Sequence, residues 1–479
     1  MKTRSPFLAL LVMLLAAPAI TAEPATAPAP IPGKGLVGTW LGALTVNAGM
    51  KLRLELTVTE ADGKLSAILN SIDQNAKIPA SSVSATAETA EFECATINGK
   101  FEGRFSADGS EIVGTWSQGG GSMPLTLRRQ AAPFVLKRPQ EPAKPYPYRE
   151  EEVAFPNKAA GISLAGTLTL PQGKGPFGAV VLMSGSGPQD RDEALLGHKP
   201  FLILADHLTR AGIAVLRYDD RGVGKSTGSF GTATHLDFAA DGRAAFDYLQ
   251  TRPEIDRKHI GLLGHSEGSV YAPLIVRDEP GVAYVVFLAG VGVPVRELLE
   301  RQSQDIVTAS GLKYERTPAL KAIDDAIYER LRTSTNDAEL LDFVRAKLKE
   351  GLALLPDDLK KAMGIDEANI EPRVRMMVSP AFVQLSQYDP RATLPAIKCP
   401  VLALFGTKDR QVAAEPNSEG MKATFAKSGN RQVTLKTFDG LNHLFQHATT
   451  GAPSEYANIE ETMAPEVLAS VATWINKQL

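Results

Sequence analysis

The sequence predicts an α/β fold in two parts: a small antiparallel β domain at residues 36–135 and a larger domain with a mostly parallel sheet at residues 150–479. Three observations support this prediction. Alternating polar and apolar residues fill the first region, strand-like and helix-like segments alternate in the second, and four prolines lie between them. A chain of 479 residues is also too long for a single hydrophobic core.

The first 22 residues are expected to be a secretory signal peptide that is cleaved after Ala22. Lys2 and Arg4 give a positive start, and an apolar run of about ten residues and then small residues follow. This run is shorter than the roughly 18 residues that a membrane-spanning helix needs. We therefore expect a secreted protein of the bacterial periplasm without a stable membrane span, in which residues 23–35 are a flexible lead-in.

Composition argues against several kinds of partner. The net charge is -3, so we expect no basic surface for nucleic acid. Cys94 and Cys399 are the two cysteines, and because they fall in different predicted domains we expect free thiols. Two cysteines are too few for a structural zinc site and no HExxH motif occurs, so neither a metal nor another cofactor is expected. No oligomeric state is predicted.

Residues 36–135 repeat a strand pattern with two Asp-Gly turn signals, at residues 62–63 and 108–109. A Gly-Thr-Trp triplet ending at Trp40 is echoed by one ending at Trp116. We expect both tryptophans to fill the core of a small sheet or barrel, with stacking on a sugar as the alternative. The proline-rich residues 136–149 are expected to form a stiff linker.

Apolar runs in the second domain are typical of strands buried on both faces of a sheet. They lie at residues 179–183, 213–218, 260–263, 283–289 and 400–405. About residues 294–395 interrupt this pattern, because they carry helical spacing and no strand signals. The spacing is seen in Leu341, Val344, Leu348 and Leu352. We expect this insertion to be a helical lid over the active site, with a surface insertion of no role as the alternative.

Gly264-His265-Ser266-Glu267-Gly268 is the most informative stretch of the chain. A strand that ends in a glycine-flanked turn and continues as a helix holds the serine hydroxyl out at the turn tip. Side chains at the two glycine positions are expected to collide with the neighbouring strand and helix. A serine hydroxyl is a poor nucleophile, so it needs a histidine as base and an acid that orients the histidine.

Acid and base candidates follow the serine in the order expected for such a turn. Asp409 comes after an apolar strand, at the end where sites of open α/β sheets lie. His443 comes just after the last predicted strand. Asp439 is the runner-up acid and His447 the alternative base. The remaining histidines precede the serine or, like His265, lie within its turn.

Two backbone N–H groups are expected to form an oxyanion site. Glu267, directly after the serine, is expected to supply one of them. The loop at residues 184–192 should supply the other, from Ser186 first and Gly187 next. Met376 and Phe382 lie where the insertion returns to the core, where they either line a substrate pocket or simply pack.

Gly224-Lys225-Ser226 has the end of a phosphate-binding motif but lacks its first glycine, because position 219 is Asp. We expect no nucleotide there. A loop braced by Asp220 and Arg221 beside the serine turn is the interpretation that the sequence favours.

Together these residues resemble the α/β-hydrolase superfamily across about residues 150–479, and within it the bacterial carboxylesterases related to EstD and the serine aminopeptidase-like (S33) hydrolases. The motifs that carry the resemblance are Ser-Gly-Ser-Gly-Pro-Gln-Asp-Arg-Asp, His-Lys-Pro-Phe, Tyr-Asp-Asp-Arg-Gly-Val-Gly-Lys-Ser, Gly-His-Ser-Glu-Gly and Gly-Thr-Lys-Asp. The resemblance implies a Ser266-Asp409-His443 triad that hydrolyses small-molecule carboxylic esters through an acyl-enzyme, with no cofactor. It also implies that His198 lies near the substrate pocket.

Two other functions stay open. A serine peptidase or amidase would use the same triad and would need acidic groups for a free amine, such as Glu267, Glu297 or Glu300. A glycan- or wall-binding protein would use the β domain for capture and the hydrolase-like part as a scaffold.

Overall fold

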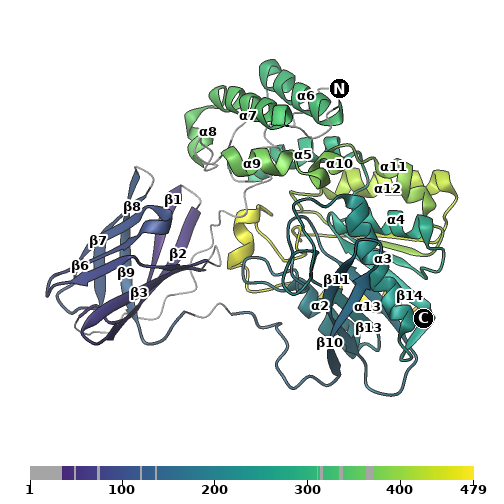
Figure 1. Cartoon of the computed structure of the whole chain (residues 1–479), viewed down its shortest axis with the longest axis horizontal. Coiled ribbons are helices and arrows are strands. Elements are labelled where there is room, and N and C mark those ends of the chain that lie inside the picture. The colour runs from purple at the N-terminus through teal and green to yellow at the C-terminus, as the bar shows by residue number, and fades with distance from the viewer. Residues whose placement is uncertain are drawn as a thin grey trace. The chain divides into compact units, whose positions relative to one another are not determined.

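The computed structural model describes residues 35–47, 50–72, 76–118, 121–134, 137–309, 311–312, 317–333, 338–362 and 370–479. The expected signal peptide and nearly all of the lead-in lie outside the described residues. The chain forms two compact units (Figure 1). One consists of Arg138–Ala452 and Glu461–Leu479, and the other of Pro453–Glu460 and the described part of Ala16–Lys137.

The N-terminal unit contains an antiparallel sheet in the order β4-β3-β2-β1-β9-β8-β7-β6-β5. Most neighbours in this sheet are therefore also neighbours along the chain. β5 lies close to β3 as well, so the sheet curls back on itself. The strands are β1 (Gly38–Asn47), β2 (Met50–Ala61), β3 (Lys64–Ser71), β4 (Ala76–Pro79), β5 (Ser82–Ala85), β6 (Thr89–Cys94), β7 (Gly99–Phe105), β8 (Glu111–Gln118) and β9 (Gly121–Gln130).

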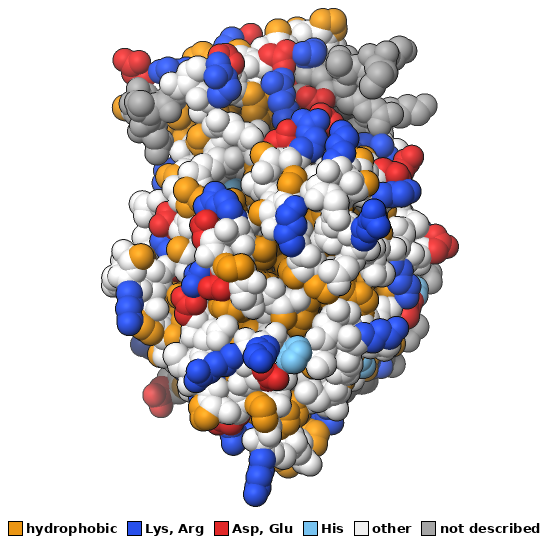
Figure 2. Space-filling model, turned by 90° about the vertical axis from the view of Figure 1, so that its right-hand side faces the viewer, with side chains coloured by type: hydrophobic (Ala, Val, Ile, Leu, Met, Phe, Trp, Pro, Cys, Tyr) orange, Lys and Arg blue, Asp and Glu red, His pale blue; other side chains and the backbone are white. Residues whose placement is uncertain are grey.

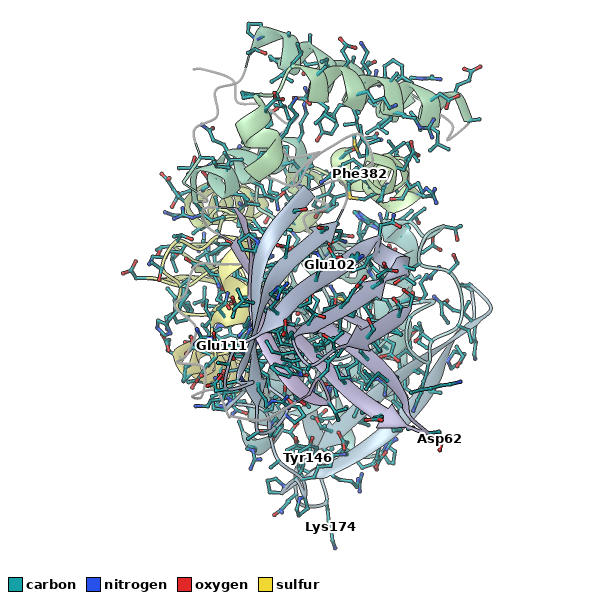
Figure 3. The ribbon with its side chains drawn as sticks, turned by 90° about the vertical axis from the view of Figure 1, so that its left-hand side faces the viewer. Asp62, Glu102, Glu111, Tyr146, Lys174 and Phe382 are labelled. Atoms are coloured by element: carbon teal, nitrogen blue, oxygen red, sulfur yellow. The ribbon has the colours of Figure 1, made fainter. Side chains whose placement is uncertain are left out.

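The turn between β2 and β3 follows its sequence signal. Asp62 and Gly63 connect the strands directly and have φ angles of 53° and 72°. Two positive φ angles give the turn type whose twist matches that of an antiparallel hairpin. Asp62 lies at the tip of this hairpin (Figure 3).

Large aromatic side chains fill the core of this unit. Trp40 and Trp116 are fully buried, which confirms the core prediction. The Phe92 ring lies 5.2 Å from that of Phe101 and 6.0 Å from that of Trp116, measured between centroids. The Trp40 indole N–H donates to the Leu36 carbonyl at 2.8 Å. Because both indoles are buried, neither presents a face on which a sugar can stack.

Residues 137–148 contain no helix or strand, and from Arg138 onward they belong to the α/β unit. The Gln140 side-chain oxygen accepts the backbone N–H groups of Thr462 and Met463 at 2.6 and 3.1 Å. The rings of Tyr146, labelled in Figure 3, and Tyr148 stack with centroids 5.1 Å apart. Most of this proline-rich segment is therefore attached to the α/β unit.

The sheet of the α/β unit has the order β10-β11-β13-β12-β14-β15-β16-β17. β11 is antiparallel to β10 and β13, and the other neighbours are parallel. The chain leaves β12 for β13 on one side and returns to β14 on the other, and ligand sites of α/β sheets lie at such reversals. The strands are β10 (Arg149–Asn157), β11 (Ile162–Leu170), β12 (Phe177–Met183), β13 (Ala214–Tyr218), β14 (Ile255–His265), β15 (Val285–Leu288), β16 (Val401–Gly406) and β17 (Val433–Phe438).

Helices cover this sheet, so β13, β15 and β16 are buried along their whole length. α3 packs against α4, and α2 packs against α13. α3 starts at a capping box in which the Thr234 and Asp237 side chains each accept the other's backbone N–H. The helices are α2 (Pro200–Arg210), α3 (His235–Thr251), α4 (Gly268–Asp278), α12 (Ala414–Ser428) and α13 (Pro465–Ile475).

The described part of residues 294–395 is helical and lies between β15 and β16 in the chain. Leu340, Val344, Leu348 and Leu352 form the buried stripe of α7. Leu340 thus takes the buried position for which the sequence suggested Leu341, which is half-buried. The helices are α5 (Val295–Ala309), α6 (Pro318–Thr333), α7 (Ala338–Ala353), α8 (Asp357–Ala362), α9 (Ile370–Met377), α10 (Pro380–Ser386) and α11 (Pro390–Thr393).

The surface mixes charges of both signs. Figure 2 shows Lys and Arg side chains scattered over one face of the molecule, among apolar and acidic ones. This agrees with a net charge of -3. Among the residues that the structure describes, no helix has both the length and the apolar character that crossing a membrane requires.

Candidate active site

Ser266 lies on a sharp turn between β14 and α4. Its φ angle is 51°, an unfavourable value for a residue other than glycine, and the side chain is half-exposed. The Ser266 N–H donates to the Leu288 carbonyl of β15 at 2.9 Å, and the Ser266 carbonyl accepts the Ser269 N–H at 3.0 Å. These bonds fix a strained backbone that holds the hydroxyl at the carboxyl end of the sheet.

The two glycines of the motif are required by close packing. A Cβ atom on Gly264 would lie 2.3 Å from the Gly268 carbonyl oxygen, and one on Gly268 would lie 2.3 Å from the Met183 carbonyl oxygen. Both distances are shorter than atoms can approach without moving the backbone. This confirms the steric reason that the sequence predicts for these glycines.

Asp409 and His443 form a buried hydrogen bond. Asp409 Oδ2 lies 2.8 Å from His443 Nδ1. The other carboxylate oxygen, Oδ1, accepts the backbone N–H groups of Gln411 and Val412, each at 2.8 Å. The carboxylate is therefore held from both sides, with one oxygen directed at the imidazole.

The alternative acid and base lie elsewhere. Asp439 Oδ1 accepts the Thr407 hydroxyl at 2.9 Å, so Asp439 ties together the turns that follow β16 and β17. His447 is exposed and pairs with Glu461 at 2.9 Å and with Glu466 at 3.2 Å. Neither side chain takes part in the Asp409–His443 hydrogen bond.

The structure brings the turn of Ser266 and the loop of His443 together. His265, the residue before Ser266, donates from Nε2 to the His443 carbonyl at 3.1 Å. The rings of His265 and His443 lie 4.9 Å apart between centroids. The position of His265 within the serine turn argues against a role as base, and the structure places it in the contact between these two loops.

The loop after β12 lies against the same turn. A Cβ atom on Gly185 would lie 3.4 Å from Ser266 Cβ. Within the described chain, no acceptor is found for the backbone N–H of Ser186 or of Glu267. Gly187 has a φ angle of 88° and open space around it. The two amides expected at the oxyanion site thus have no acceptor among the described residues.

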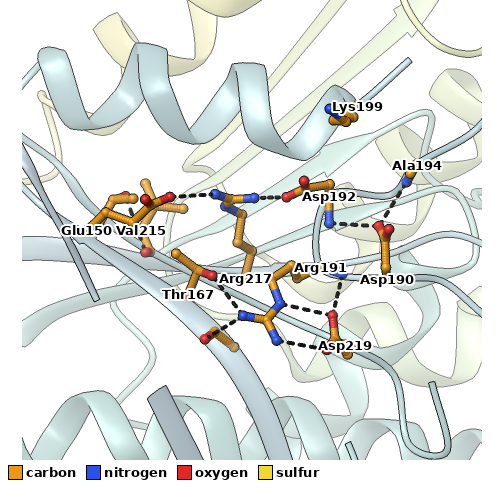
Figure 4. A network of polar contacts seen from close by, with 12 residues as sticks. Glu150, Thr167, Asp190, Arg191, Asp192, Ala194, Lys199, Val215, Arg217 and Asp219 are labelled. Atoms are coloured by element: carbon orange, nitrogen blue, oxygen red, sulfur yellow. Dashed lines mark hydrogen bonds and ion pairs between the residues drawn. The ribbon is translucent and has the colours of Figure 1, made fainter. Parts of the chain in front are cut away.

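Charged side chains hold the far part of this loop (Figure 4). Arg191 binds both carboxylate oxygens of Asp219, at 2.9 and 2.8 Å, and also donates to the Gly166 carbonyl at 2.9 Å. Arg217 of β13, which is buried, pairs with Asp192. The hydrogen bond to Asp219 raises the pKa of Arg191 above its ordinary value, so the pair stays charged.

Asp220 holds the near part of the loop. Its carboxylate accepts the Ser184 hydroxyl at 3.1 Å and the Gln189 N–H at 3.0 Å. Burial raises the pKa of Asp220 to about 7, although these hydrogen bonds act to lower it. Arg221 binds the buried Asp241 at 2.6 Å. Asp220 thus braces the loop after β12, and Arg221 is bound to α3.

The Gly-Lys-Ser stretch holds a carboxylate of its own chain where a phosphate loop would hold its ligand. The Lys225 N–H donates to Asp219 Oδ2 at 3.0 Å. A Cβ atom on Gly224 would lie 2.4 Å from the same oxygen. The residue that breaks the motif in the sequence thus fills the loop in the structure.

Glu267 carries a side-chain cluster that the sequence did not indicate. Its Oε1 accepts the Tyr271 hydroxyl at 2.8 Å and lies 3.1 Å from His235 Nε2. Burial acts to raise the pKa of Glu267, but His235 and Tyr271 bring it below its ordinary value. The His235 N–H donates to the Gln384 side chain of α10 at 2.9 Å, so the helical insertion reaches the neighbour of Ser266.

The residues expected to line a pocket have different surroundings. His198 is fully buried, with Nδ1 2.8 Å from Thr462 Oγ1 and Nε2 3.0 Å from Gln446 Nε2, so its ring faces protein on both sides. Phe382 is buried in α10, and Met376 is half-buried in α9. His198 therefore packs against the loop that carries His443, through its contact with Gln446.

Cys94 and Cys399 are free thiols, as the sequence predicts. In the described parts of the chain, no cluster of His, Cys, Asp and Glu is suited to a metal ion.

The chain is similar to known hydrolases. The profile of a family described as serine aminopeptidase, S33, matches residues 200–448. Esterase EstD of Thermotoga maritima is 29% identical over 317 residues, and the match spans 66% of this chain and 66% of that esterase.

Solved structures with similarity to the chain include a hypothetical protein of Pseudomonas aeruginosa and an esterase of Pyrococcus furiosus. The first is 15% identical, covers 73% of this chain and 100% of its own, and has a TM-score of 0.42. The second is 16% identical, with coverages of 73% and 99% and a TM-score of 0.41.

Proposed function

Because the chain belongs to the serine aminopeptidase S33 family of hydrolases, we propose that it is a serine carboxylesterase acting on small or medium esters. The observation that carries this proposal is the buried hydrogen bond of 2.8 Å between His443 Nδ1 and Asp409 Oδ2, in a loop that contacts the Ser266 turn. The similarity to an esterase of Thermotoga maritima supports the choice of esters.

The proposed mechanism assigns one role to each group. Asp409 accepts a hydrogen bond from the Nδ1–H group of His443, so Nε2 is free to take the hydroxyl proton of Ser266 as the oxygen attacks the ester carbonyl. The N–H groups of Ser186 and Glu267 stabilise the oxyanion, each by about 3–4 kcal/mol in the transition state. His443 then gives the proton to the leaving alcohol. Water, activated by the same imidazole, releases the acid from the acyl-enzyme.

We propose that the helical insertion, α5 to α11, acts as a lid over this site. The hydrogen bond between Gln384 of α10 and the backbone of His235, whose ring lies 3.1 Å from the Glu267 carboxylate, supports this role. Loops and insertions of this kind exclude water and shape the substrate pocket. In Gln384→Ala, the lid proposal expects a changed chain-length preference among esters. An unchanged preference argues against it.

We further propose that the protein is secreted to the periplasm after removal of residues 1–22. The support is the signal-peptide pattern of the sequence. Mass spectrometry of the protein from a periplasmic fraction should give a chain that begins at Glu23. A full-length chain in the cytoplasmic fraction contradicts secretion.

Hydrolysis of a p-nitrophenyl ester series, from acetate to long acyl chains, tests the enzymatic proposal. In Ser266→Ala, kcat is expected to fall on the order of 10⁶-fold. Ser229→Ala, at an exposed serine, is the matched control and should leave the rate unchanged. Activity that survives in Ser266→Ala rules out the proposed nucleophile.

A second candidate, an aminopeptidase with the same triad, is favoured by the Glu267 carboxylate. An ionised carboxylate beside the nucleophile is what the binding of a substrate ammonium requires, and the pKa of Glu267 is lowered. Amino-acid p-nitroanilides separate the two functions. If kcat/KM for anilides exceeds that for esters and falls in Glu267→Gln, the aminopeptidase function replaces the esterase.

A further inference from the structure

A second acid–histidine pair lies behind the proposed triad. Glu193 and His265 are both buried, with Glu193 Oε1 2.8 Å from His265 Nδ1. The same oxygen accepts the Gly185 N–H at 2.7 Å. On the other side of the ring, His265 Nε2 donates to the His443 carbonyl at 3.1 Å.

These partners determine the protonation of His265. The His443 carbonyl oxygen can only accept a hydrogen bond, so His265 Nε2 carries a proton. An ionised Glu193 carboxylate also has no proton to donate, so His265 Nδ1 must be the donor to Glu193 Oε1. Burial acts to lower the pKa of His265, but the charge of Glu193 and the two hydrogen bonds raise it above its ordinary value. The two acceptors on opposite sides of the ring therefore favour an imidazolium of His265 facing a carboxylate of Glu193.

The contacts of this pair reach all three parts of the proposed machinery. Gly185 directly precedes Ser186, the proposed oxyanion donor, and His265 directly precedes Ser266. The third contact is the carbonyl of His443 itself. Glu193 and His265 thus contact three segments: the loop after β12 with Ser186, the turn after β14 with Ser266, and the loop after β17 with His443.

We propose that Glu193 and His265 are positioning residues. As an ion pair, they hold the oxyanion donor, the nucleophile and the base in the relative positions that the reaction requires. The proposal rests on the proposed function, because it gives the pair a task in the same reaction. Both side chains act through neighbouring residues and not by contact with the substrate. A misplacement of about 1 Å in such a site can cost about 100-fold in rate.

Glu193→Gln tests the proposal with little change of shape. The amide removes the negative charge, so His265 keeps a single ring proton and cannot serve both acceptors. We expect kcat and kcat/KM to fall together by about 100-fold, with KM unchanged, because the loss affects the transition state alone. Asp256→Asn is the matched control, since Asp256 Oδ2 lies 2.9 Å from His259 Nδ1 at the other end of β14, half-exposed. It should leave the rate unchanged.

The fall of kcat at unchanged KM is the readout that a merely structural role would not produce, and nitrogen NMR of the wild-type protein with labelled histidine checks the ion pair itself. We expect one buried ring to carry protons on both nitrogens at pH 6.5, and to lose one of them in Glu193→Gln. A neutral His265 in the wild type overturns the proposal even if the variant fails to fold. A Glu193→Gln enzyme with full kcat also overturns it. A wild type without esterase activity, or a Ser266→Ala variant as active as the wild type, counts against the proposed function instead.

Discussion

Replacement of Asp409 by Asn should reverse the tautomer of His443. Asp409 Oδ1 accepts two backbone N–H groups, from Gln411 and Val412, at 2.8 Å each. In the variant, only the amide oxygen can occupy that position, because an NH₂ group there would face two donors. The NH₂ group must then point at His443 Nδ1, where the carboxylate oxygen now lies at 2.8 Å.

The consequence for the rate follows from this geometry. Nδ1 of His443 becomes an acceptor, its proton moves to Nε2, and Ser266 loses the lone pair that takes its proton. The same substitution in another serine-hydrolase triad lowers kcat about 10⁴-fold, which corresponds to about 5 kcal/mol in the activation free energy. We expect a fall of this size here, with the fold intact.

Steady-state kinetics on p-nitrophenyl acetate measures this effect, and circular dichroism checks the fold. Asp439→Asn is the control, because Asp439 accepts the Thr407 hydroxyl at 2.9 Å and not a proton of His443. Its kcat should stay close to that of the wild type. A value for Asp409→Asn within tenfold of the wild type, or a larger loss in Asp439→Asn, refutes the assignment of the acid.

Three further predictions concern stability. Burial raises the pKa of Asp220 from 3.8 to about 7, so the stability that its protonated form contributes is present below pH 3.8 and is lost as the pH rises to about 7. The unfolding free energy of Asp220→Asn, relative to that of the wild type, should therefore rise by up to about 4 kcal/mol between pH 3.5 and 8. Urea denaturation that gives the same difference at every pH contradicts this. In Gly268→Ala the new Cβ would lie 2.3 Å from the Met183 carbonyl oxygen, and thermal unfolding should report a loss of about 1–3 kcal/mol together with most of the esterase activity. Trp40→Ala empties a fully buried position and should cost about 3–5 kcal/mol in urea denaturation followed by circular dichroism, whereas a loss below 1 kcal/mol would mean that the site is not packed.

The sequence predicted those parts of the fold that follow from local pattern. Strands buried on both faces must be apolar, so β12, β14, β15 and β16 stand out as runs between polar segments. The glycines of the serine turn are also predictable from the sequence, because close backbone packing permits no side chain at Gly264 and Gly268. Chain order and the places after β16 and β17 predict Asp409 and His443 as acid and base, and the two side chains lie within hydrogen-bond distance.

Apart from the brace at Asp220 and Arg221, the charged contacts inside the α/β unit were not predicted. Glu193 and His265 are 72 residues apart. In the sequence, a buried charged residue in a loop cannot be told from an exposed one. Only the packing of several loops buries Glu193 and places a histidine against it. Two signals pointed this way: the Gln-Asp-Arg-Asp run before Glu193, and the histidine directly before Ser266.

The attachment of the proline-rich segment to the α/β unit was also not predictable from its composition. Its composition predicts a stiff chain, which describes local conformation but not attachment. The hydrogen bonds of Gln140 with the backbone at Thr462 and Met463 join residues more than 300 positions apart. Contacts between residues so far apart in the sequence depend on the completed fold, so no local sequence pattern predicts them.

Covalent labelling of the nucleophile tests the central claim most directly. A p-nitrophenyl alkylphosphonate reacts with an activated serine and releases one nitrophenol per site, and the adduct can be located by mass spectrometry of the digested protein. We predict one phosphonate per chain, on the peptide that contains Ser266, and none in Ser266→Ala. An adduct at another residue, or equal labelling of the Ser266→Ala variant, contradicts the claim that this chain is a serine hydrolase acting through Ser266.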